Sequence, residues 1–196
     1  MKAWLIIVFV ILGIGLLTIF SLVSWVIGTR NKLYSASIEI DQQWSQIETV
    51  LQMRFDKIPN LVELAKGYMK YEGSVLEEVT RLRSQWGEAK TQEEKMVAGD
   101  ELGNALGRLM VVIENYPQLK ALEPVTTVMD ELSGTENRIK QERRLYNEKV
   151  GSYNKMIVMF PDNIIANFFG FKEKPFFEAE EESHQAPKIN GSEMYQ

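Results

Sequence analysis

The side chains that carry out most enzyme chemistry are scarce in this sequence of 196 residues. It has no cysteine and a single histidine, His184, which follows a run of glutamates near the C-terminus. Serine and threonine nucleophiles therefore lack a histidine base, and the Glu-x-x-His pairs that bind di-metal centres in helical bundles are missing. A phosphate-binding GxxxxGK loop is also absent. The sequence predicts no catalytic residue, no metal or other cofactor, and no small-molecule substrate.

Adjacent glutamates are the remaining candidates for acid–base chemistry. Glu77 and Glu78 form one such pair, and Glu93 and Glu94 form another. Neighbouring residues on a helix point in different directions, so such pairs usually mark a solvated face. We therefore expect a protein that is not an enzyme. The net charge of −5, without a basic block, also argues against nucleic acid as a partner.

Residues 1–30 form an apolar segment, in which no residue from position 3 to position 29 is charged. As a helix, residues 3–28 would be about 39 Å long, which exceeds the thickness of about 30 Å of a hydrocarbon core. Aromatic and basic side chains stand at the ends of the segment, as they do around membrane spans. These are Trp4, Trp25, Arg30 and Lys32.

We expect this segment to be a transmembrane anchor and not a cleaved signal peptide. The apolar run is longer than the usual h-region of about 7–15 residues, and no A-x-A-like cleavage site follows it. The N-terminal amine and Lys2 balance Arg30 and Lys32, so the distribution of basic residues does not indicate an orientation. The sequence predicts a single-pass membrane protein and leaves open on which side of the membrane the rest lies.

Residues 31–177 show a helical repeat, in which apolar residues recur at alternating spacings of three and four. This spacing is typical of packed helices that run nearly parallel or antiparallel to each other. Four such stripes run over residues 33–58, 61–86, 102–116 and 125–160. The predicted fold class is all-α, with an N-terminal transmembrane helix followed by an antiparallel bundle of about four long helices.

Prolines and capping residues predict where these helices begin and end. Pro59 disfavours helix at the preceding residue, and Asn60 with Glu63 can cap a new helix, which predicts a hairpin at this point. Thr91 and Glu94 repeat the capping pattern at the start of the third helix. If Pro59 only kinks one continuous helix, the protein is a longer and thinner coiled coil, and this alternative stays open.

Two regular spacings mark individual helix faces. Gly99, Gly103 and Gly107 lie four residues apart. Each costs about 1 kcal/mol relative to alanine in a helix, and close helix–helix packing is the favoured explanation, with a hinge or a ligand groove as the alternative. Tyr146 and Tyr153, each followed by asparagine, lie one heptad apart, which places both hydroxyls on one face.

Charged residues interrupt the apolar stripes. Arg54 falls on the first stripe, and Glu136 and Arg143 fall on the fourth. If the fourth helix returns toward the membrane beside the first, residues whose numbers add to about 190 are level, and Arg54 then faces Glu136. One hypothesis is that this pair sets the antiparallel register, because a polar residue at a core position is costly unless it is paired. The alternative is that both side chains reach solvent.

The segment at residues 160–177 is unusually aromatic and follows a helix that is expected to end beside the bilayer. It is expected either to lie in the membrane interface, with Lys172 and Lys174 near the headgroups, or to cap the open end of the bundle core. Both alternatives stay open. Its apolar residues are Phe160, Ile164, Ile165, Phe168, Phe169, Phe171, Phe176 and Phe177. The acidic tail at residues 178–196 is expected to be disordered.

Several short strings occur together, in order, along the chain after the anchor. They are WSQIE at 44–48, RFDKIPNLVE at 54–63, KGY at 66–68, ENYPQLKA at 114–121, ELSGTENRI at 131–139, YN at 146–147 and 153–154, FPDN at 160–163 and FGFK at 169–172. Through these strings the sequence resembles the LemA family over nearly its whole length after the anchor. The resemblance implies a membrane-anchored, all-helical bacterial protein. It supplies no catalytic residues, because the family has no established biochemical activity.

Two functional hypotheses follow. The first is a non-catalytic scaffold or interaction module in the bacterial cell envelope, held in the cell membrane by one span. Its partners would be the lipid bilayer and another membrane-associated protein or a second copy of itself. The alternative is a lipid-contacting, envelope-remodelling protein that acts through the aromatic segment after Phe160. A concave site with convergent carboxylates would instead indicate an enzyme.

Overall fold

The computed structural model describes residues 2–69 and 71–177, and all regular structure among them is helical. The helices are α1 (Lys2–Lys66), α2 (Gly73–Glu88), α3 (Gln92–Glu114), α4 (Pro117–Lys120), α5 (Glu123–Val158) and α6 (Asp162–Phe169). The acidic tail for which the sequence predicts disorder, residues 178–196, lies outside the described part of the chain.

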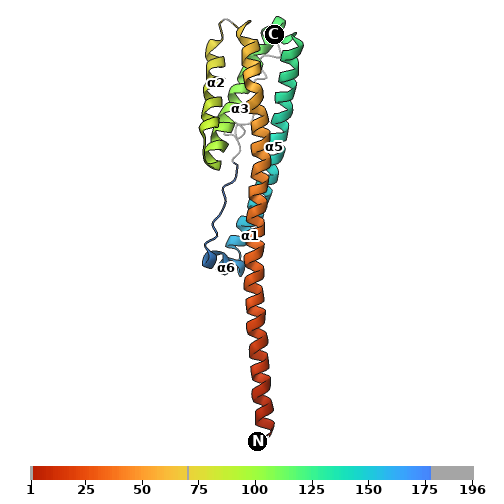
Figure 1. The fold of residues 1–196 in the computed structure, drawn as a ribbon, viewed down its shortest axis with the longest axis vertical. Helices are drawn as coiled ribbons and strands as arrows, with labels where there is room; N and C mark the ends of the chain where they lie inside the picture. The colour runs from red at the N-terminus through yellow and green to blue at the C-terminus, as the bar shows by residue number, and fades with distance from the viewer. Residues whose placement is uncertain (1, 70, 178–196) are drawn as a thin grey trace, which may run out of the picture.

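The helices form an antiparallel bundle around one half of a long rod (Figure 1). The rod is α1, and α2, α3 and α5 surround only its C-terminal half. α1 pairs most extensively with α5, while α2 and α3 form a hairpin that packs against this pair. The predicted fold class, an apolar N-terminal helix followed by a helical bundle, is confirmed.

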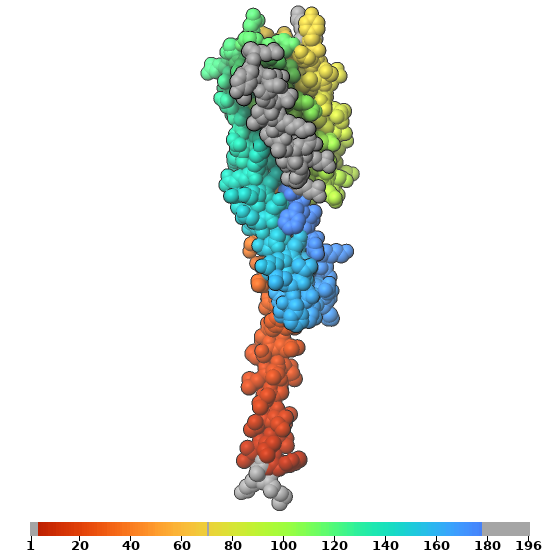
Figure 2. Space-filling view, turned by 180° about the vertical axis from the view of Figure 1, so that it is seen from behind, coloured from red at the N-terminus to blue at the C-terminus, as the bar shows by residue number. Residues whose placement is uncertain are grey.

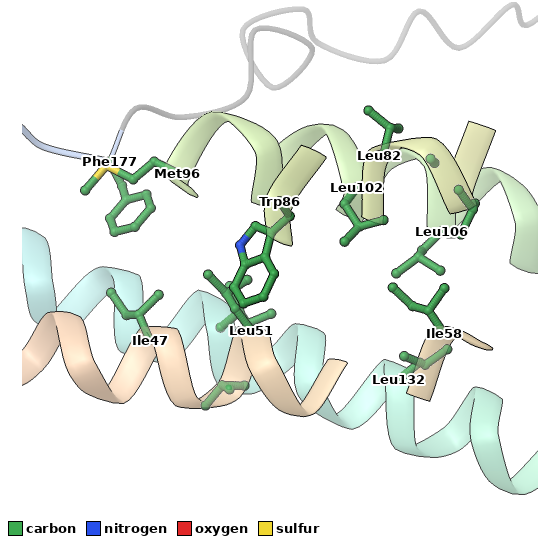
Figure 3. Packing of buried hydrophobic residues seen from close by; sticks show 14 of the residues in the cluster. Ile47, Leu51, Ile58, Leu82, Trp86, Met96, Leu102, Leu106, Leu132 and Phe177 are labelled. Atoms are coloured by element: carbon green, nitrogen blue, oxygen red, sulfur yellow. The ribbon is translucent and has the colours of Figure 1, made fainter. Parts of the chain in front are cut away.

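The core of the bundle consists of apolar side chains from all four long helices. Trp86 of α2 points toward Leu51 of α1, and Leu106 of α3 points toward Ile58 of α1 (Figure 3). Each helix presents one apolar stripe because its apolar residues recur every three or four positions. Burial of each such leucine or isoleucine contributes about 1.5–3 kcal/mol, which makes this shared core the main source of stability.

α1 is one helix of 65 residues, which corresponds to a length of about 98 Å. Its first half contains a stretch that is long and apolar enough to cross a membrane. No side chain from residue 4 to residue 28 is buried in the protein, and burial begins at Thr29 and continues with Leu33 and Ile40. The bundle therefore begins at the residue where the apolar segment ends.

The predicted hairpin at Pro59 is wrong. α1 continues through Pro59 to Lys66, and the chain turns back only before Gly73, where α2 begins. Leu61 and Leu64, which the sequence places on a second helix, therefore belong to α1. The alternative is thus confirmed in its continuous helix, but because the chain folds back after Lys66 the protein is a bundle and not a longer, thinner coiled coil.

An arginine from a neighbouring helix explains why α1 continues through the proline. Pro59 has no N–H, so the carbonyl oxygen of Phe55, four residues earlier, loses its helical donor. The Nε of Arg83 on α2 donates a hydrogen bond to this oxygen at 3.2 Å. The guanidinium of Arg83 also lies over the Phe55 ring, 3.9 Å from its centroid. The contact is tertiary, so rules for local helix ends do not reveal it.

Arg83→Met is expected to lower the free energy of unfolding by about 1–2 kcal/mol, because the Phe55 carbonyl loses a donor and the ring loses a cation. The loss should be smaller in a Pro59→Ala background, in which residue 59 supplies its own N–H to Phe55. Both losses are measured by denaturant titrations, followed by circular dichroism, of the unchanged protein, the two single variants and the double variant. Equal losses in the two backgrounds would contradict this role of Arg83.

The predicted capping box of the third helix is confirmed at the start of α3. Thr91 Oγ1 accepts a hydrogen bond from the Glu94 N–H at 3.1 Å, and Glu94 Oε2 accepts one from the Thr91 N–H at 3.2 Å. The N–H groups of Lys90 and Thr91 hold the pKa of Glu94 below its usual value. α5 begins at Glu123, two residues before the fourth predicted stripe, and ends at Val158, two residues before the end of that stripe.

The glycines of α3 serve two different purposes. A Cβ atom at Gly99 would lie 3.5 Å from the Leu51 side chain, and one at Gly103 would lie 3.1 Å from Nη1 of Arg54. Nothing lies within 4 Å of a Cβ atom at Gly107. Close packing against α1 therefore explains Gly103, whereas a Cβ atom at Gly99 would make an ordinary van der Waals contact and one at Gly107 would meet open space.

Candidate functional site: a charged groove and the base of the bundle

A charged groove of about 420 Å³ runs between α3 and α5, with one side chain of α1 at its floor. It is open where α3 carries glycine in place of larger side chains. The lining residues are Arg54, Gly99, Asp100, Gly103, Asn104, Leu106, Gly107, Met110, Leu132, Ser133, Glu136, Asn137, Ile139, Lys140 and Arg143.

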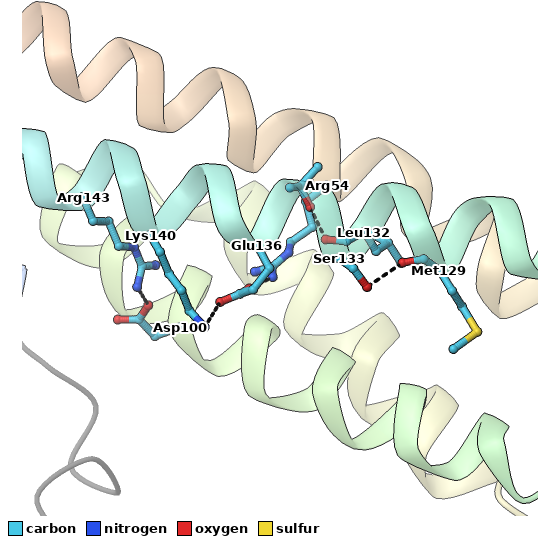
Figure 4. Close-up of polar contacts among 9 residues, drawn as sticks. Arg54, Asp100, Met129, Leu132, Ser133, Glu136, Lys140 and Arg143 are labelled. Carbon is cyan, nitrogen blue, oxygen red and sulfur yellow. Dashed lines mark hydrogen bonds and ion pairs between the residues drawn. The ribbon is translucent and has the colours of Figure 1, made fainter.

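Ion pairs cross this groove and join three helices (Figure 4). Arg54 of α1 pairs with Glu136 of α5, and Arg143 of α5 pairs with Asp100 of α3. Lys140 Nζ lies 3.5 Å from the Glu136 carboxylate, one helical turn away. The Arg54 side chain is 6% exposed and that of Glu136 is 35% exposed, so a buried cation meets a partly solvated carboxylate.

The structure brings Arg54 and Glu136 together, whereas Arg143 contacts α3 instead of α1. Other pairs of α1 and α5 lie level with each other in the same way. The rings of Trp44 and Tyr146, whose residue numbers also add to 190, have centroids 6.2 Å apart. That the Arg54–Glu136 pair sets this register remains a prediction.

The groove contains ion pairs between side chains of different helices. Both of its carboxylates, Asp100 and Glu136, face an arginine. The hydroxyl of Ser133 donates a hydrogen bond to the carbonyl of Met129 at 2.9 Å and is thus engaged by its own helix. In the described part of the chain, no three acidic or histidine side chains are grouped as metal ligands would be.

A second feature is the C-terminal strap, residues 171–177, which runs in an extended conformation from the base of the bundle back along α5 (Figures 1 and 2). Two asparagines of α5 hold its backbone. The side-chain amide of Asn154 both donates to and accepts from the backbone of Lys174, at 2.9 Å in each case. Asn147 makes the same two bonds with Phe177, also at 2.9 Å.

The spacing of these asparagines matches the strap that they hold. Asn147 and Asn154 lie seven residues apart, which is about 10.5 Å along a helix. Lys174 and Phe177 lie three residues apart, and an extended chain covers about 10 Å over that interval. Lys174 also donates to Asp41 of α1 at 2.9 Å. The strap is therefore fastened to both long helices.

Phe177 ends the strap in an aromatic pocket between α1 and α5. Its ring stacks on Trp44 with a centroid distance of 5.8 Å and meets the edge of Tyr146 at 5.3 Å. The guanidinium of Arg143 lies 4.8 Å from the centroid of the same ring. Burial, with a smaller contribution from Asp41, raises the pKa of the Tyr146 hydroxyl.

The aromatic segment predicted at residues 160–177 divides into two sets. Ile165, Phe171 and Phe177 face the bundle, where Phe171 meets the edge of Tyr34 with a centroid distance of 5.2 Å. The other members of the segment are exposed: Phe160, Ile164, Phe168, Phe169 and Phe176. Neither the capping alternative nor the interfacial alternative describes the whole segment.

The predicted ends of the anchor lie at different places on the rod. Trp4 is on the bare part of α1 and Trp25 is near its end, both exposed, and Lys32 is exposed beside the bundle. Arg30 lies between the ring of Tyr34, 4.9 Å from its centroid, and the ring of Phe169, 5.2 Å away. Arg30 thus joins the anchor to α6 at the base of the bundle.

Sequence reasoning missed the role of Asn147 and Asn154. The repeated YN string indicates a helix face through its tyrosines, which are buried in the core. The heptad spacing of the asparagines was the available signal, since it places both amides on one helix face. An extended segment without periodicity gave no sign that it would be their partner.

Similarity to known proteins covers the same region. The LemA family matches residues 43–190. The magnetosome protein MamQ 2 of Paramagnetospirillum magneticum is 26% identical, over 84% of this chain and 70% of that protein. The protein LemA of Metamycoplasma hominis is 27% identical over 156 residues, or 79% of this chain and 71% of the relative. The magnetosome protein MamQ of Magnetospirillum gryphiswaldense is 28% identical, over 76% of this chain and 55% of its own length.

The family match spans most of the chain and contains every helix from α2 to α6, together with α1 from residue 43 to its end. The groove, the asparagines of α5 and the strap all lie within it. With its apolar N-terminal half of α1, the chain is a membrane-associated helical protein. It belongs to the LemA family.

Proposed function

We propose that this protein is a single-pass, non-catalytic interaction module of the bacterial cell envelope, which holds its helical bundle at a fixed orientation on the membrane for another membrane-associated protein or a second copy of itself. The observation that carries the proposal is the continuity of α1, which is both the anchor and the central helix of the bundle. A flexible linker would let a domain turn freely, whereas an unbroken helix transmits the orientation of the span.

The chemistry of the bundle supports a binding role over a catalytic one. Its charged groove contains ion pairs between helices, and its carboxylates already face arginines. Ion pairs and buried aromatic contacts hold helices at fixed positions, which is what a binding surface requires. Neither relative's name, MamQ or LemA, denotes an enzyme.

Site-specific photo-cross-linking in native membranes tests this proposal. A photoreactive amino acid is placed at Tyr71, which is 92% exposed in the turn between α1 and α2, or at Val111, which is 64% exposed on α3. Leu109, which is buried on α3, serves as the matched control. We expect a discrete adduct of defined mass from at least one exposed position and none from Leu109.

A chimera separates the role of the bundle from that of the span. Replacing residues 1–28 with an unrelated transmembrane helix should preserve the adduct, because the bundle supplies the binding surface and the span supplies the position. Recovery of monomer alone from every exposed position would overturn the proposal. Loss of the adduct in the chimera would move the interaction into the membrane span.

A further inference from the structure

A cluster of exposed apolar side chains occupies the corner between α5 and α6. We call it the basal patch, and its members are Val158, Met159, Phe160, Ile164, Phe168 and Phe169. Phe160 is 79% exposed and Phe168 is 82% exposed. Single exposed apolar residues are common in soluble proteins, but a cluster that includes three phenylalanines marks a surface that is covered by something else.

The basal patch lies at the level where the anchor ends. Thr29 Oγ1 donates a hydrogen bond to Asp162 Oδ1 at 3.3 Å, which ties the first residue of α6 to the first buried residue of α1. α6 lies beside α1 at the end of the bundle that adjoins the bare half of the rod (Figures 1 and 2). The position of the patch along the membrane normal is therefore set by α1.

α6 is held in a fixed rotation, so its exposed face is defined. Ile165 and Ala166 are buried against the bundle, while Ile164 and Phe168, four residues apart, share the opposite side. Gly170 ends the helix in a left-handed conformation, with φ of 74°, and the strap that follows is fastened to α5. An exposed apolar face on a fixed helix is available for a planar partner.

Basic residues border the basal patch. Arg30 contacts the ring of Phe169 with its guanidinium, and Lys155 and Lys172 are exposed just before and just after the patch in the sequence. Apolar side chains flanked by cations are typical of helices that lie in the interface of a membrane with anionic lipids. A bilayer therefore matches both the composition of the patch and its level.

We propose that the basal patch inserts into the interface of the same membrane that α1 crosses, as a second contact with the lipid bilayer. Residues 3–28 span about 39 Å against a hydrocarbon thickness of about 30 Å, so α1 has length to spare for a tilt toward α6. The continuous α1 sets the tilt of the bundle relative to the membrane, but a span alone still allows the bundle to rotate about the axis of α1. A second contact to one side removes that freedom and fixes which face of the bundle points along the membrane.

Spin labelling of the full-length protein tests this inference directly. The chain has no cysteine, so one introduced cysteine carries one nitroxide. Ile164→Cys and Phe168→Cys report on the patch, Leu16→Cys on the span, and Val97→Cys on exposed α3 away from the membrane. Each protein is reconstituted in vesicles of phosphatidylethanolamine and phosphatidylglycerol. Collision rates with oxygen and with a water-soluble nickel complex then measure the depth of each label.

We expect the oxygen-to-nickel ratio at positions 164 and 168 to be several-fold higher than at position 97 and lower than at position 16. A ratio equal to that at position 97 would place the patch in water and overturn the inference. Shielding from both collision partners would mean that protein, such as a second copy of the chain, covers the patch, and would overturn it as well.

A variant pair shows whether the phenylalanines hold the patch in the membrane. Phe160→Ser with Phe168→Ser should move a label at position 164 toward the aqueous value, with helicity unchanged by circular dichroism. The matched control, Val97→Ser with Val111→Ser, removes exposed apolar side chains from α3 and should leave the depth unchanged. An unchanged depth in the phenylalanine variant would overturn the inference. The outcome does not depend on whether the bundle binds another protein.

Discussion

Glu136→Leu is expected to lower the free energy of unfolding of the bundle by about 3 kcal/mol, because the charge of Arg54 stays buried with one fewer counter-ion. The Arg54 side chain is 6% exposed and lies against Gly103, so it has little room to move toward water. The measurement is a denaturant titration of the full-length protein in detergent micelles, followed by circular dichroism.

Glu131→Leu is the matched control for this change. Glu131 lies on the same helix and pairs with Lys57 of α1, but both side chains of that pair are substantially exposed. Exposed pairs contribute about 0–1 kcal/mol, so the control should lose no more than that. Equal losses from the two leucine variants would show that the Arg54–Glu136 pair acts as a surface pair, and would remove the basis for its role in the register.

The double variant Arg54→Met with Glu136→Leu tests whether charge or packing matters. Replacing both members of a buried pair by apolar side chains is often neutral, so the double variant should recover most of the stability that Glu136→Leu loses. If the pair selects the register, the recovered protein should be less specific in its pairing of α1 with α5. Cysteine cross-linking between the two helices, at level positions and at positions one heptad out of register, measures that specificity.

Phe177→Ala is expected to cost about 3 kcal/mol, because it empties the aromatic pocket formed with Trp44 and Tyr146. The strap should then detach from its last fixed point, and limited proteolysis should cleave residues 171–177 faster than in the unchanged protein. Denaturant titration and the rate of cleavage are the two measurements.

Phe176→Ala provides the control at the neighbouring position. Phe176 is half exposed, so its removal should cost less than about 1 kcal/mol. Asn147→Ala, which removes both hydrogen bonds to the Phe177 backbone, should fall between the two phenylalanine variants. If Phe177→Ala and Phe176→Ala behaved alike, the buried ring would not be what holds the strap.

Features that depend on neighbouring residues in the chain were predictable. The capping box at Thr91 and Glu94 involves residues three apart, and its geometry follows from the start of any helix. The apolar stripes predicted the all-α bundle because a helical period of 3.6 residues identifies the buried face without knowledge of its partner. Arg54 and Glu136 were predicted to lie at the same height along the bundle, because the rise per residue is constant in two antiparallel helices.

Features that depend on a partner far away in the sequence were not predictable. Pro59 argues for a helix end by every local rule, yet Arg83 of α2 supplies the hydrogen bond that the proline removes. The asparagines of α5 bind a strap whose extended backbone has no apolar period to reveal it. The aromatic segment divides into buried and exposed sets only when α6 packs beside α1.

The N-terminal apolar segment, the helical bundle and the family follow from the amino-acid sequence, because each rests on local composition, on helical periodicity or on short strings. The continuity of α1 through Pro59, the clamping of the strap and the place of the basal patch at the end of the anchor follow only from the folded chain. The physical reason is that each of these satisfies a hydrogen bond or buries a side chain through residues on another helix, and such contacts exist only after the helices have packed.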